Sequence, residues 1–435
     1  MKFYNRTYEI ATLQGIEQAS IDSAQMTMMV GRRRVGKTTL LKNAFNKTPF
    51  LYFFVAKKNE ILLCNEFSLE ITQKLAIPIG NYSSFSELFK AVMQLSQQIN
   101  FTLVIDEFQE FSTVNPSIFS DMQNIWDSMK ANSKINLILC GSIISMMKRI
   151  FENSKEPLFG RATSRMIVKE FDIKTIKEIL SDYHPKYTNE DLLAFYMITG
   201  GVAKYVEQLI IKKAFTKKSI LDTLFSEGSF FLDEGRNVLI DEFGKDYGNY
   251  FSILSLIASS KTDRGQIEGT LKMDVGGYLS RLEKEYNIIK RNRPFGAKEG
   301  SRSNKYKIED CFLNFWFRFI YKYRSAVEIG NFDYIRDIVE RDYETYSGII
   351  LEKYFRATMI EAKEFSDIKG YWNSKGEDEI DIVAINELEK RLLFCEVKRN
   401  PRRISLSELK NKARDIIAKH PKYTTEFKGL SLEDM

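Results

Sequence analysis

Short apolar runs in the first third of the chain have the length of buried β-strands. They occupy residues 26–30, 101–105 and 135–140, and each stops at a glycine or an acidic residue. The segment 39–45, soon after the first run, has the pattern of the first turns of a helix. Continuous apolar runs of about four to eight residues are typical of strands covered on both faces. The pattern therefore predicts an α/β region at the beginning of the chain.

The rest of the chain begins with helical periodicity and ends with alternation. Apolar positions predict helices over 173–180, 191–198, 251–258, 275–283 and 348–355. A turn at 296–304 leads into a predicted strand at 305–308, as in a hairpin. Residues 379–384 and 391–398 are predicted to be strands, and apolar and polar positions alternate in Ile380-Asp381-Ile382 and in Glu396-Val397-Lys398. We expect a mainly helical middle followed by a second α/β region.

Composition excludes several function classes without selecting one. The 435 residues suffice for about three domains, and a net charge of +6 does not by itself indicate nucleic acid. Two histidines argue against a histidine-rich metal site or a serine–histidine triad. The four cysteines lie far apart among apolar neighbours, as reduced thiols of a cytosolic protein do. Because no apolar signal core or bilayer-length run occurs, we expect a cytoplasmic location and no membrane partner.

A complete phosphate-binding loop follows the first predicted strand: Gly31-Arg32-Arg33-Arg34-Val35-Gly36-Lys37-Thr38. Its glycines let backbone N–H groups turn toward phosphates, and the helix N-terminus adds its positive dipole end. We expect Lys37 to reach the β- and γ-phosphates and the Thr38 hydroxyl to ligate Mg²⁺. The residues predicted to bind ATP are Gly31, Arg34, Val35, Gly36, Lys37, Thr38, Thr39 and Asp106.

Polar residues also follow the other two predicted strands. Asp106 is expected to hold the Mg²⁺ shell, and Glu107 to polarise the water that attacks the γ-phosphate. Ser142 follows the strand at 135–140, where its hydroxyl can position the same water. A turn serine that caps the following helix is an equally good interpretation of Ser142.

Several segments together resemble the archaeal-type ATPase family, a relative of the AAA+ and STAND P-loop proteins. The resemblance rests on residues 5–9 with Leu13, the three arginines of the loop, and the segments 105–109, 140–142 and 157–163. It implies a P-loop NTPase domain with an AAA+-like parallel sheet, a small helical lid and nucleotide-driven switching. It also implies that Arg161 can reach the γ-phosphate of its own or a neighbouring subunit. A surface arginine without this role is the alternative.

The middle of the chain suggests a lid and a winged helix-turn-helix. In the predicted lid, Val202 and Ala203 follow Gly200-Gly201 where family members usually have a small residue and proline, which leaves a nucleotide contact by Lys204 open. Residues 250–307 resemble a winged helix-turn-helix whose hairpin is basic, so that it could follow a phosphate backbone. Because the helix in the recognition position has little charge, a winged domain that packs on the ATPase and reports its state is an equal alternative.

About the last ninety residues resemble the PD-(D/E)XK nuclease superfamily. The match implies Asp381 and Glu396 as ligands of Mg²⁺ or Mn²⁺, Lys398 as the catalytic cation and Glu352 as an added outer ligand. Ile380 stands where proline is usual before the first acid. Basic residues that could contact phosphates follow the motif: Arg399, Arg402, Arg403, Lys410, Lys412 and Arg414. A domain that kept the fold and lost the activity is the alternative.

The sequence therefore predicts four parts and two competing functions. The parts are a P-loop ATPase core at 1–168, a helical lid at 169–232, a winged helix at 233–325 and a restriction-endonuclease-like α/β domain at 326–435. The leading hypothesis is an Mg²⁺-dependent ATPase whose ATP or ADP state controls DNA binding or processing, as in a defence protein. The competing hypothesis is a STAND-type nucleotide switch that acts through a protein partner or homo-oligomer and has an inactive C-terminal domain.

Overall fold

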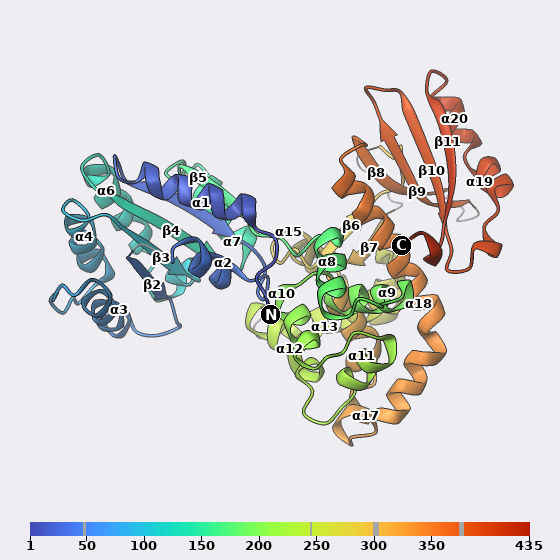
Figure 1. Cartoon of the computed structure of the whole chain (residues 1–435), viewed down its shortest axis with the longest axis horizontal. Coiled ribbons are helices and arrows are strands. Elements are labelled where there is room, and N and C mark those ends of the chain that lie inside the picture. The colour runs from blue at the N-terminus through green and yellow to red at the C-terminus, as the bar shows by residue number, and fades with distance from the viewer. Residues whose placement is uncertain (47–48, 244–245, 299–303, 374–377) are drawn as a thin grey trace. The chain divides into compact units, whose positions relative to one another are not determined.

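The chain forms two compact units in the computed structural model, which describes residues 1–46, 49–243, 246–298, 304–373 and 378–435 (Figure 1). Unit 2 is the contiguous segment Asn5–Lys169, and unit 1 combines Met1–Tyr4 with Glu170–Met435. Part of the predicted wing turn, including Arg302, and residues 374–377 of the turn before the first alternating strand lie outside the described residues.

Unit 2 is built on a five-stranded parallel sheet, which confirms the predicted α/β fold with a parallel sheet. The strands are β1 (Gln25–Val30), β2 (Phe50–Phe54), β3 (Phe101–Asp106), β4 (Ile135–Gly141) and β5 (Ser164–Ile167). Their order is β2-β3-β4-β1-β5, and every neighbouring pair is parallel. The carboxyl ends therefore lie at one edge, and the residues that follow β1, β3 and β4 meet there.

Helices cover both faces of this sheet (Figure 1). They are α1 (Thr7–Ala19), α2 (Lys37–Ala44), α3 (Glu60–Leu75), α4 (Phe85–Leu95), the short η1 (Phe108–Glu110) and α5 (Phe111–Val114), α6 (Ile118–Met129) and α7 (Ile144–Glu152). Leu13 of α1 and Leu40 of α2 pack with Met29 on one face. Residues of α3, α4, α6 and α7 pack with Met28 on the other. Burial on both faces explains why these strands are continuous apolar runs.

Unit 1 begins with a long helical region that contains one β-hairpin. Its helices are α8 (Ile173–Tyr183), α9 (Asn189–Thr199), α10 (Ala203–Ile211), α11 (Lys217–Leu224), α12 (Phe230–Phe243), α13 (Tyr247–Ala258), α14 (Arg264–Leu271) and α15 (Gly276–Lys284). The antiparallel strands β6 (Ile289–Asn292) and β7 (Lys305–Ile308) follow. Then come α16 (Cys311–Phe315), a π-helical turn (Trp316–Tyr321), α17 (Arg324–Glu328) and the long α18 (Phe332–Ala362).

A four-stranded sheet ends the chain. It consists of β8 (Asp367–Trp372), β9 (Glu379–Asn386), β10 (Arg391–Val397) and β11 (Thr424–Leu430), in the order β11-β10-β9-β8. Only the β10–β11 pair is parallel. Between these two strands lie η4 (Pro401–Arg403), α19 (Leu406–Lys412) and α20 (Arg414–Lys419), and η5 (Leu432–Asp434) follows β11.

One hydrophobic core runs through the parts of unit 1. It includes Phe195 of α9, Leu254 of α13, Phe317 of the π-helical turn, Tyr354 of α18 and Cys395 of β10. A second, smaller cluster covers the other face of the C-terminal sheet and includes residues of α19 and α20. The C-terminal sheet is thus packed into the helical region on one face.

Candidate nucleotide site and C-terminal carboxylate cluster

The phosphate-binding loop connects the end of β1 to the first residue of α2. Gly36 has a φ of 93°, a left-handed conformation that favours glycine. A side chain at Gly31 would place its Cβ 2.6 Å from the carbonyl oxygen of Val168, so only glycine fits there. Lys37 is buried, and its Nζ donates to the carbonyl oxygens of Gly31 at 2.6 Å and Arg32 at 3.3 Å. The loop therefore wraps around the lysine ammonium.

Thr38, Tyr52 and Asp106 meet at the carboxyl edge of the sheet. The Tyr52 hydroxyl lies 3.3 Å from Thr38 Oγ1 and donates a hydrogen bond to Asp106 Oδ2. Burial, followed by the Asp106 carboxylate, raises the pKa of Tyr52 above its usual range. The expected Mg²⁺ ligands Thr38 and Asp106 are thus brought together, and both contact a tyrosine that the sequence patterns did not single out.

Glu107 is held by two donors from neighbouring elements. Its φ of 52° is left-handed, which is uncommon for a non-glycine residue and is frequent at functional sites. Its Oε2 accepts from Ser142 Oγ at 2.7 Å and from Gln109 Nε2 at 2.5 Å. The helix α7 begins after Ile143 without a side-chain cap, so Ser142 is not its cap. Ser142 instead orients Glu107.

Gln109 is a candidate that sequence reasoning missed as a site residue. It is almost fully buried, and its Oε1 has no hydrogen-bond partner among the described residues. A Cβ at Gly141 would lie 2.6 Å from this oxygen, so the glycine leaves room for the glutamine. Its one visible signal was its place two residues after Glu107 at the end of a buried strand.

Arg161 lies at the opposite edge of the sheet. It precedes β5, whose first residue Ser164 pairs with Thr27 in the first half of β1. The phosphate loop follows the other end of β1, which has six residues and spans about 20 Å. Arg161 donates to Asp127 Oδ2 through Nε at 3.1 Å and Nη2 at 2.8 Å. This corrects the expectation that Arg161 reaches the γ-phosphate of its own subunit, and only the neighbouring-subunit role stays a prediction.

The remaining loop and lid residues have simple placements. Val35 is buried, Arg34 and Thr39 are exposed, and Thr39 lies in the first turn of α2. In the lid, a Cβ at Gly201 would lie 2.2 Å from the carbonyl oxygen of Phe171, which explains the glycine. Lys204 forms an ion pair with Glu207 at 2.8 Å.

Asp381, Glu396 and Lys398 come together in the C-terminal sheet. Asp381 Oδ2 accepts the backbone N–H of Val397 at 2.7 Å and lies 3.4 Å from Lys398 Nζ. The same ammonium lies 3.2 Å from Glu396 Oε1. Burial is the largest single influence on Lys398 and opposes its charge, but the two carboxylates together outweigh it and raise its pKa. We call these three residues the carboxylate cluster.

Glu396 has an unsatisfied oxygen. Its side chain is 8% exposed, Lys412 Nζ lies 4.0 Å from Oε1, and Oε2 has no hydrogen-bond partner among the described residues. A buried carboxylate oxygen without a donor is costly unless another group satisfies it. Two carboxylates with one open oxygen fit an oxygen-preferring divalent cation. No group of three or more His, Cys, Asp or Glu side chains suited to a metal occurs in the described part of the chain.

Glu352 is engaged elsewhere. Its Oε1 accepts from Arg356 and lies 3.7 Å from Lys307 Nζ. Arg356 also donates to the backbone oxygen of Asp381. The structure therefore does not bring the Glu352 carboxylate into the carboxylate cluster, and an arginine stands between the two.

The basic residues after β10 do not form one open surface. Arg399 Nη2 is paired with Glu190 at 2.5 Å, and Nη1 donates to Ser347 Oγ at 2.8 Å. Lys410 lies over the Phe427 ring. Arg402, Arg403 and Arg414 are exposed. Arg399 therefore ties the end of β10 to α9 and α18 and is not available to phosphates.

The β6–β7 hairpin packs against the C-terminal sheet. Phe295, which follows β6, is buried in the cluster of that sheet, and its N–H donates to the Gly370 oxygen at 2.8 Å. Lys305 Nζ lies 3.0 Å from Glu379 and 4.7 Å from the centre of the Trp372 ring. The hairpin lysines expected to follow a phosphate backbone are therefore partly neutralised by acids of the C-terminal region.

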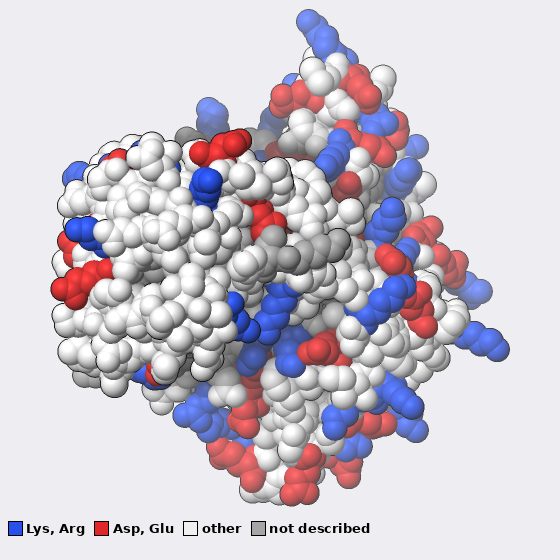
Figure 2. All heavy atoms as spheres, turned by 60° about the vertical axis from the view of Figure 1, so that its left-hand side comes forward, with Lys and Arg blue, Asp and Glu red and all other residues white. Residues whose placement is uncertain are grey.

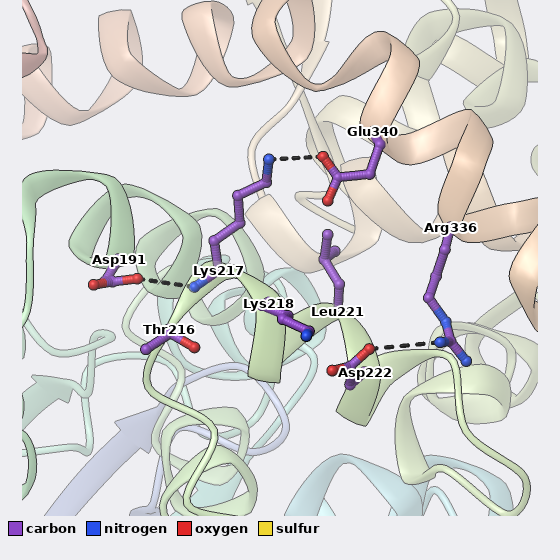
Figure 3. Close-up of a pocket in the computed structure, with 8 residues that line it drawn as sticks. All are labelled: Asp191, Thr216, Lys217, Lys218, Leu221, Asp222, Arg336 and Glu340. Carbon is purple, nitrogen blue, oxygen red and sulfur yellow. Dashed lines mark hydrogen bonds and ion pairs between the residues drawn. The ribbon is translucent and has the colours of Figure 1, made fainter.

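A cavity of about 510 Å³ lies between α11 and α18 (Figure 3). Ion pairs cross it: Lys217 with Glu340 at 2.8 Å and Arg336 with Asp222 at 3.5 Å (Figure 3). Asp191 accepts the backbone N–H of Lys217. Four of the charged side chains that line the cavity are thus paired with one another across it. Within the described ranges, no helix combines the length and the apolar character needed to cross a membrane.

Comparison with known proteins relates the part of the chain that carries the phosphate-binding loop to ATPase domains. Residues 3–209 match the family described as "ATPase domain predominantly from Archaea", and residues 316–414 match "Archaea bacterial proteins of unknown function". An uncharacterized protein of Methanocaldococcus jannaschii is 28% identical over 405 residues, 91% of this chain and 87% of its own length. A Walker-type ATPase of Pyrococcus abyssi superposes with a TM-score of 0.55 at 18% identity, over 72% of this chain and 96% of that chain. This last likeness supports the fold.

Proposed function

Because residues 3–209 match the model of an ATPase domain family found mainly in Archaea, we propose that this chain binds ATP with Mg²⁺ at the phosphate-binding loop and hydrolyses it. The observation that carries the proposal is that the loop, the Thr38 and Asp106 side chains joined through Tyr52, and the held Glu107 carboxylate meet at one sheet edge. Lys37 would release its loop carbonyls and bind the β- and γ-phosphates. Thr38 and Asp106 would hold Mg²⁺, which neutralises phosphate charge when bound.

Glu107 is proposed as the residue that orients and polarises the attacking water. Ser142 and Gln109 donate to one of its oxygens and thereby fix the carboxylate, which leaves the other oxygen to accept from water. Arg161 is proposed to act only on the nucleotide of a neighbouring subunit. The helices α8–α11 are proposed to form the lid.

The ATPase proposal is tested by nucleotide binding and turnover of the full chain. Lys37→Ala should abolish both binding and hydrolysis, whereas Glu107→Gln should keep binding and lose hydrolysis. Lys42→Ala, in the last turn of the same helix α2, is the matched control and should change neither. Equal nucleotide affinity in the wild type and Lys37→Ala would refute the site.

For the C-terminal region, we propose a divalent-cation site at the carboxylate cluster that binds and cleaves nucleic acid under control of the nucleotide state. Support comes from the pairing of Asp381 and Glu396 with Lys398 and from the open Glu396 Oε2. Asp381 and Glu396 would hold Mg²⁺ or Mn²⁺, which activates water when bound. Lys398 would stabilise negative charge on a phosphate. In the same proposal, α13–α15 and the β6–β7 hairpin form the winged helix.

Cleavage of supercoiled and single-stranded DNA tests this proposal. The wild type and Asp381→Ala are compared with Mg²⁺ or Mn²⁺, with and without ATP. Asp367→Ala is the matched control, because Asp367 lies in β8 of the same sheet and pairs with Lys369 outside the cluster. We expect cleavage in the wild type and the control but not in Asp381→Ala. Absence of cleavage alongside intact ATP turnover would refute the nuclease role.

A second candidate function is a nucleotide switch that acts through a protein partner or a homo-oligomer. The packing of Phe295 and Lys305 onto the C-terminal sheet favours it, because the hairpin is engaged within the chain. Figure 2 shows a face of unit 2 with few charged side chains. Exposed apolar side chains of this unit that could contact a partner include Phe54, Ile61, Leu62 and Leu69. Nucleotide-dependent change of mass in light scattering, with no effect of added DNA, would support this function.

A further inference from the structure

Tyr52 lies where a magnesium ion would need access. Its hydroxyl is within hydrogen-bonding distance of Thr38 Oγ1, at 3.3 Å, and donates to Asp106 Oδ2. These are the two side chains proposed to hold Mg²⁺. One neutral phenolic oxygen therefore touches both candidate ligands of the cation.

Packing of its ring fixes the position of this hydroxyl. Tyr52 pairs with Val104 across the β2–β3 ladder, two residues before Asp106 on the same face of β3. Its ring lies 6.2 Å from that of Phe50, which stacks on Phe45 at the end of α2 with 6.0 Å between centroids. The ring is thus part of the core under α2, and the hydroxyl is its one polar atom.

The hydroxyl and a magnesium ion compete for the same space and the same oxygen. Mg²⁺ binds its oxygen ligands at about 2.0–2.1 Å and demands near-ideal octahedral geometry. A cation shared by Thr38 and Asp106 would lie in the region that the Tyr52 oxygen now occupies. The Asp106 lone pair that accepts from tyrosine would also be needed by the cation or its water. Both interactions cannot be made at full strength together.

We propose that Tyr52 is a gate on the magnesium site of the proposed ATPase. Its hydroxyl occupies Asp106 until magnesium and nucleotide arrive, and their binding breaks the Tyr52–Asp106 hydrogen bond. The inference rests on the proposed ATP site and adds a residue that sets how much Mg²⁺ is needed. Nucleotide alone, held by the loop and Lys37, does not require the hydroxyl to move.

Tyr52→Phe isolates this effect, because it keeps the ring and removes the competing oxygen. Losing a hydrogen bond to a charged acceptor is expected to lower the Mg²⁺ concentration for half-saturation about tenfold. Affinity for nucleotide in the presence of a chelator should stay the same. Tyr82→Phe is the control, because Tyr82 packs against the core on the opposite face of the same sheet.

The experiment is a Mg²⁺ titration of the full chain with a fluorescent, non-hydrolysable ATP analogue, followed by fluorescence, with thermal unfolding to verify folding. A tenfold shift to lower Mg²⁺ in Tyr52→Phe, and none in Tyr82→Phe, supports the gate. If Lys37→Ala abolishes binding but Tyr52→Phe shows no shift, the gate is refuted and the ATP site stands. A shift to higher Mg²⁺ also refutes the gate, because Tyr52 would then assist the cation. If the wild type binds no nucleotide, both proposals fail.

Discussion

Phe295→Ala should detach the β6–β7 hairpin from the C-terminal sheet. Phe295 is 7% exposed and packs with Ile380, Leu392 and Phe394, although its neighbours in sequence belong to the hairpin. Truncating a buried phenylalanine costs about 3–5 kcal/mol. The ion pair of Lys305 with Glu379 on the same contact is partly exposed and contributes about 0–1 kcal/mol. The pair of Lys307 with Glu352 ties the hairpin to α18 instead and is also partly exposed. Phe295 is therefore the main anchor of the hairpin to the C-terminal sheet.

A loss of about 3–5 kcal/mol at this contact would raise the local opening equilibrium about 10²- to 10⁴-fold. Hydrogen exchange of the backbone amides, followed by mass spectrometry, measures this opening. We expect faster exchange in β6 and β8 of Phe295→Ala, while α9 and α18 stay protected. Leu388→Ala is the control, because Leu388 is 96% exposed in the turn between β9 and β10 of the same sheet and should change nothing. The same variant distinguishes the two candidate functions. If Phe295→Ala binds DNA more tightly than the wild type does, the hairpin is a DNA contact that the C-terminal sheet covers in the wild type.

Unchanged exchange in β6 and β8 of Phe295→Ala would refute this reasoning, because the hairpin would then be held by other contacts. Uniformly faster exchange throughout unit 1 would refute it differently. In that case the hairpin and the helical region would unfold as one cooperative block, and Phe295 would be an ordinary core residue.

Three further predictions concern the two sites and their support. Glu107→Gln should lower the rate of ATP hydrolysis about 10²- to 10⁴-fold, while nucleotide affinity, measured by equilibrium titration, stays unchanged. A normal rate of hydrolysis would show that Glu107 does not have the proposed role. Gly141→Ala should destabilise unit 2 by about 1–3 kcal/mol in chemical denaturation, because the new Cβ would lie 2.4 Å from Met147 Cγ, and unchanged stability would contradict this. Arg399→Ala should leave the half-buried Glu190 carboxylate without its cation and destabilise unit 1 by about 1–3 kcal/mol, whereas Arg402→Ala on the surface should not.

Local patterns predicted the ATP-binding half of the fold well because its chemistry depends on short segments. A buried strand, a glycine loop and a helix are consecutive in sequence, so the positions of Lys37 and Thr38 follow from neighbours. The same holds for Asp106 and Glu107 at the end of β3. The parallel sheet then brings these segments to one edge without further information.

Contacts between distant segments could not be predicted in this way. In the sequence, Tyr52 is one aromatic residue in an apolar segment. Only the register between β2 and β3 in the structure brings its hydroxyl to Asp106. Arg161 was assigned by its order in the chain, but the direction of β5 puts it at the far edge of the sheet. Charge counts could not show that Arg399 pairs with Glu190 across more than two hundred residues of sequence, at 2.5 Å.

The first four residues have a consequence for how the chain folds during synthesis. Residues 5–169 form a contiguous unit that can fold as soon as it is made, and Arg6 near its beginning donates to the carbonyl oxygen of Lys169 at its end. Lys2 and Tyr4, by contrast, bond to Asp182 in the later unit. Lys2 and Tyr4 precede the contiguous unit in sequence, and they must therefore wait for a helix that is made after the whole of that unit.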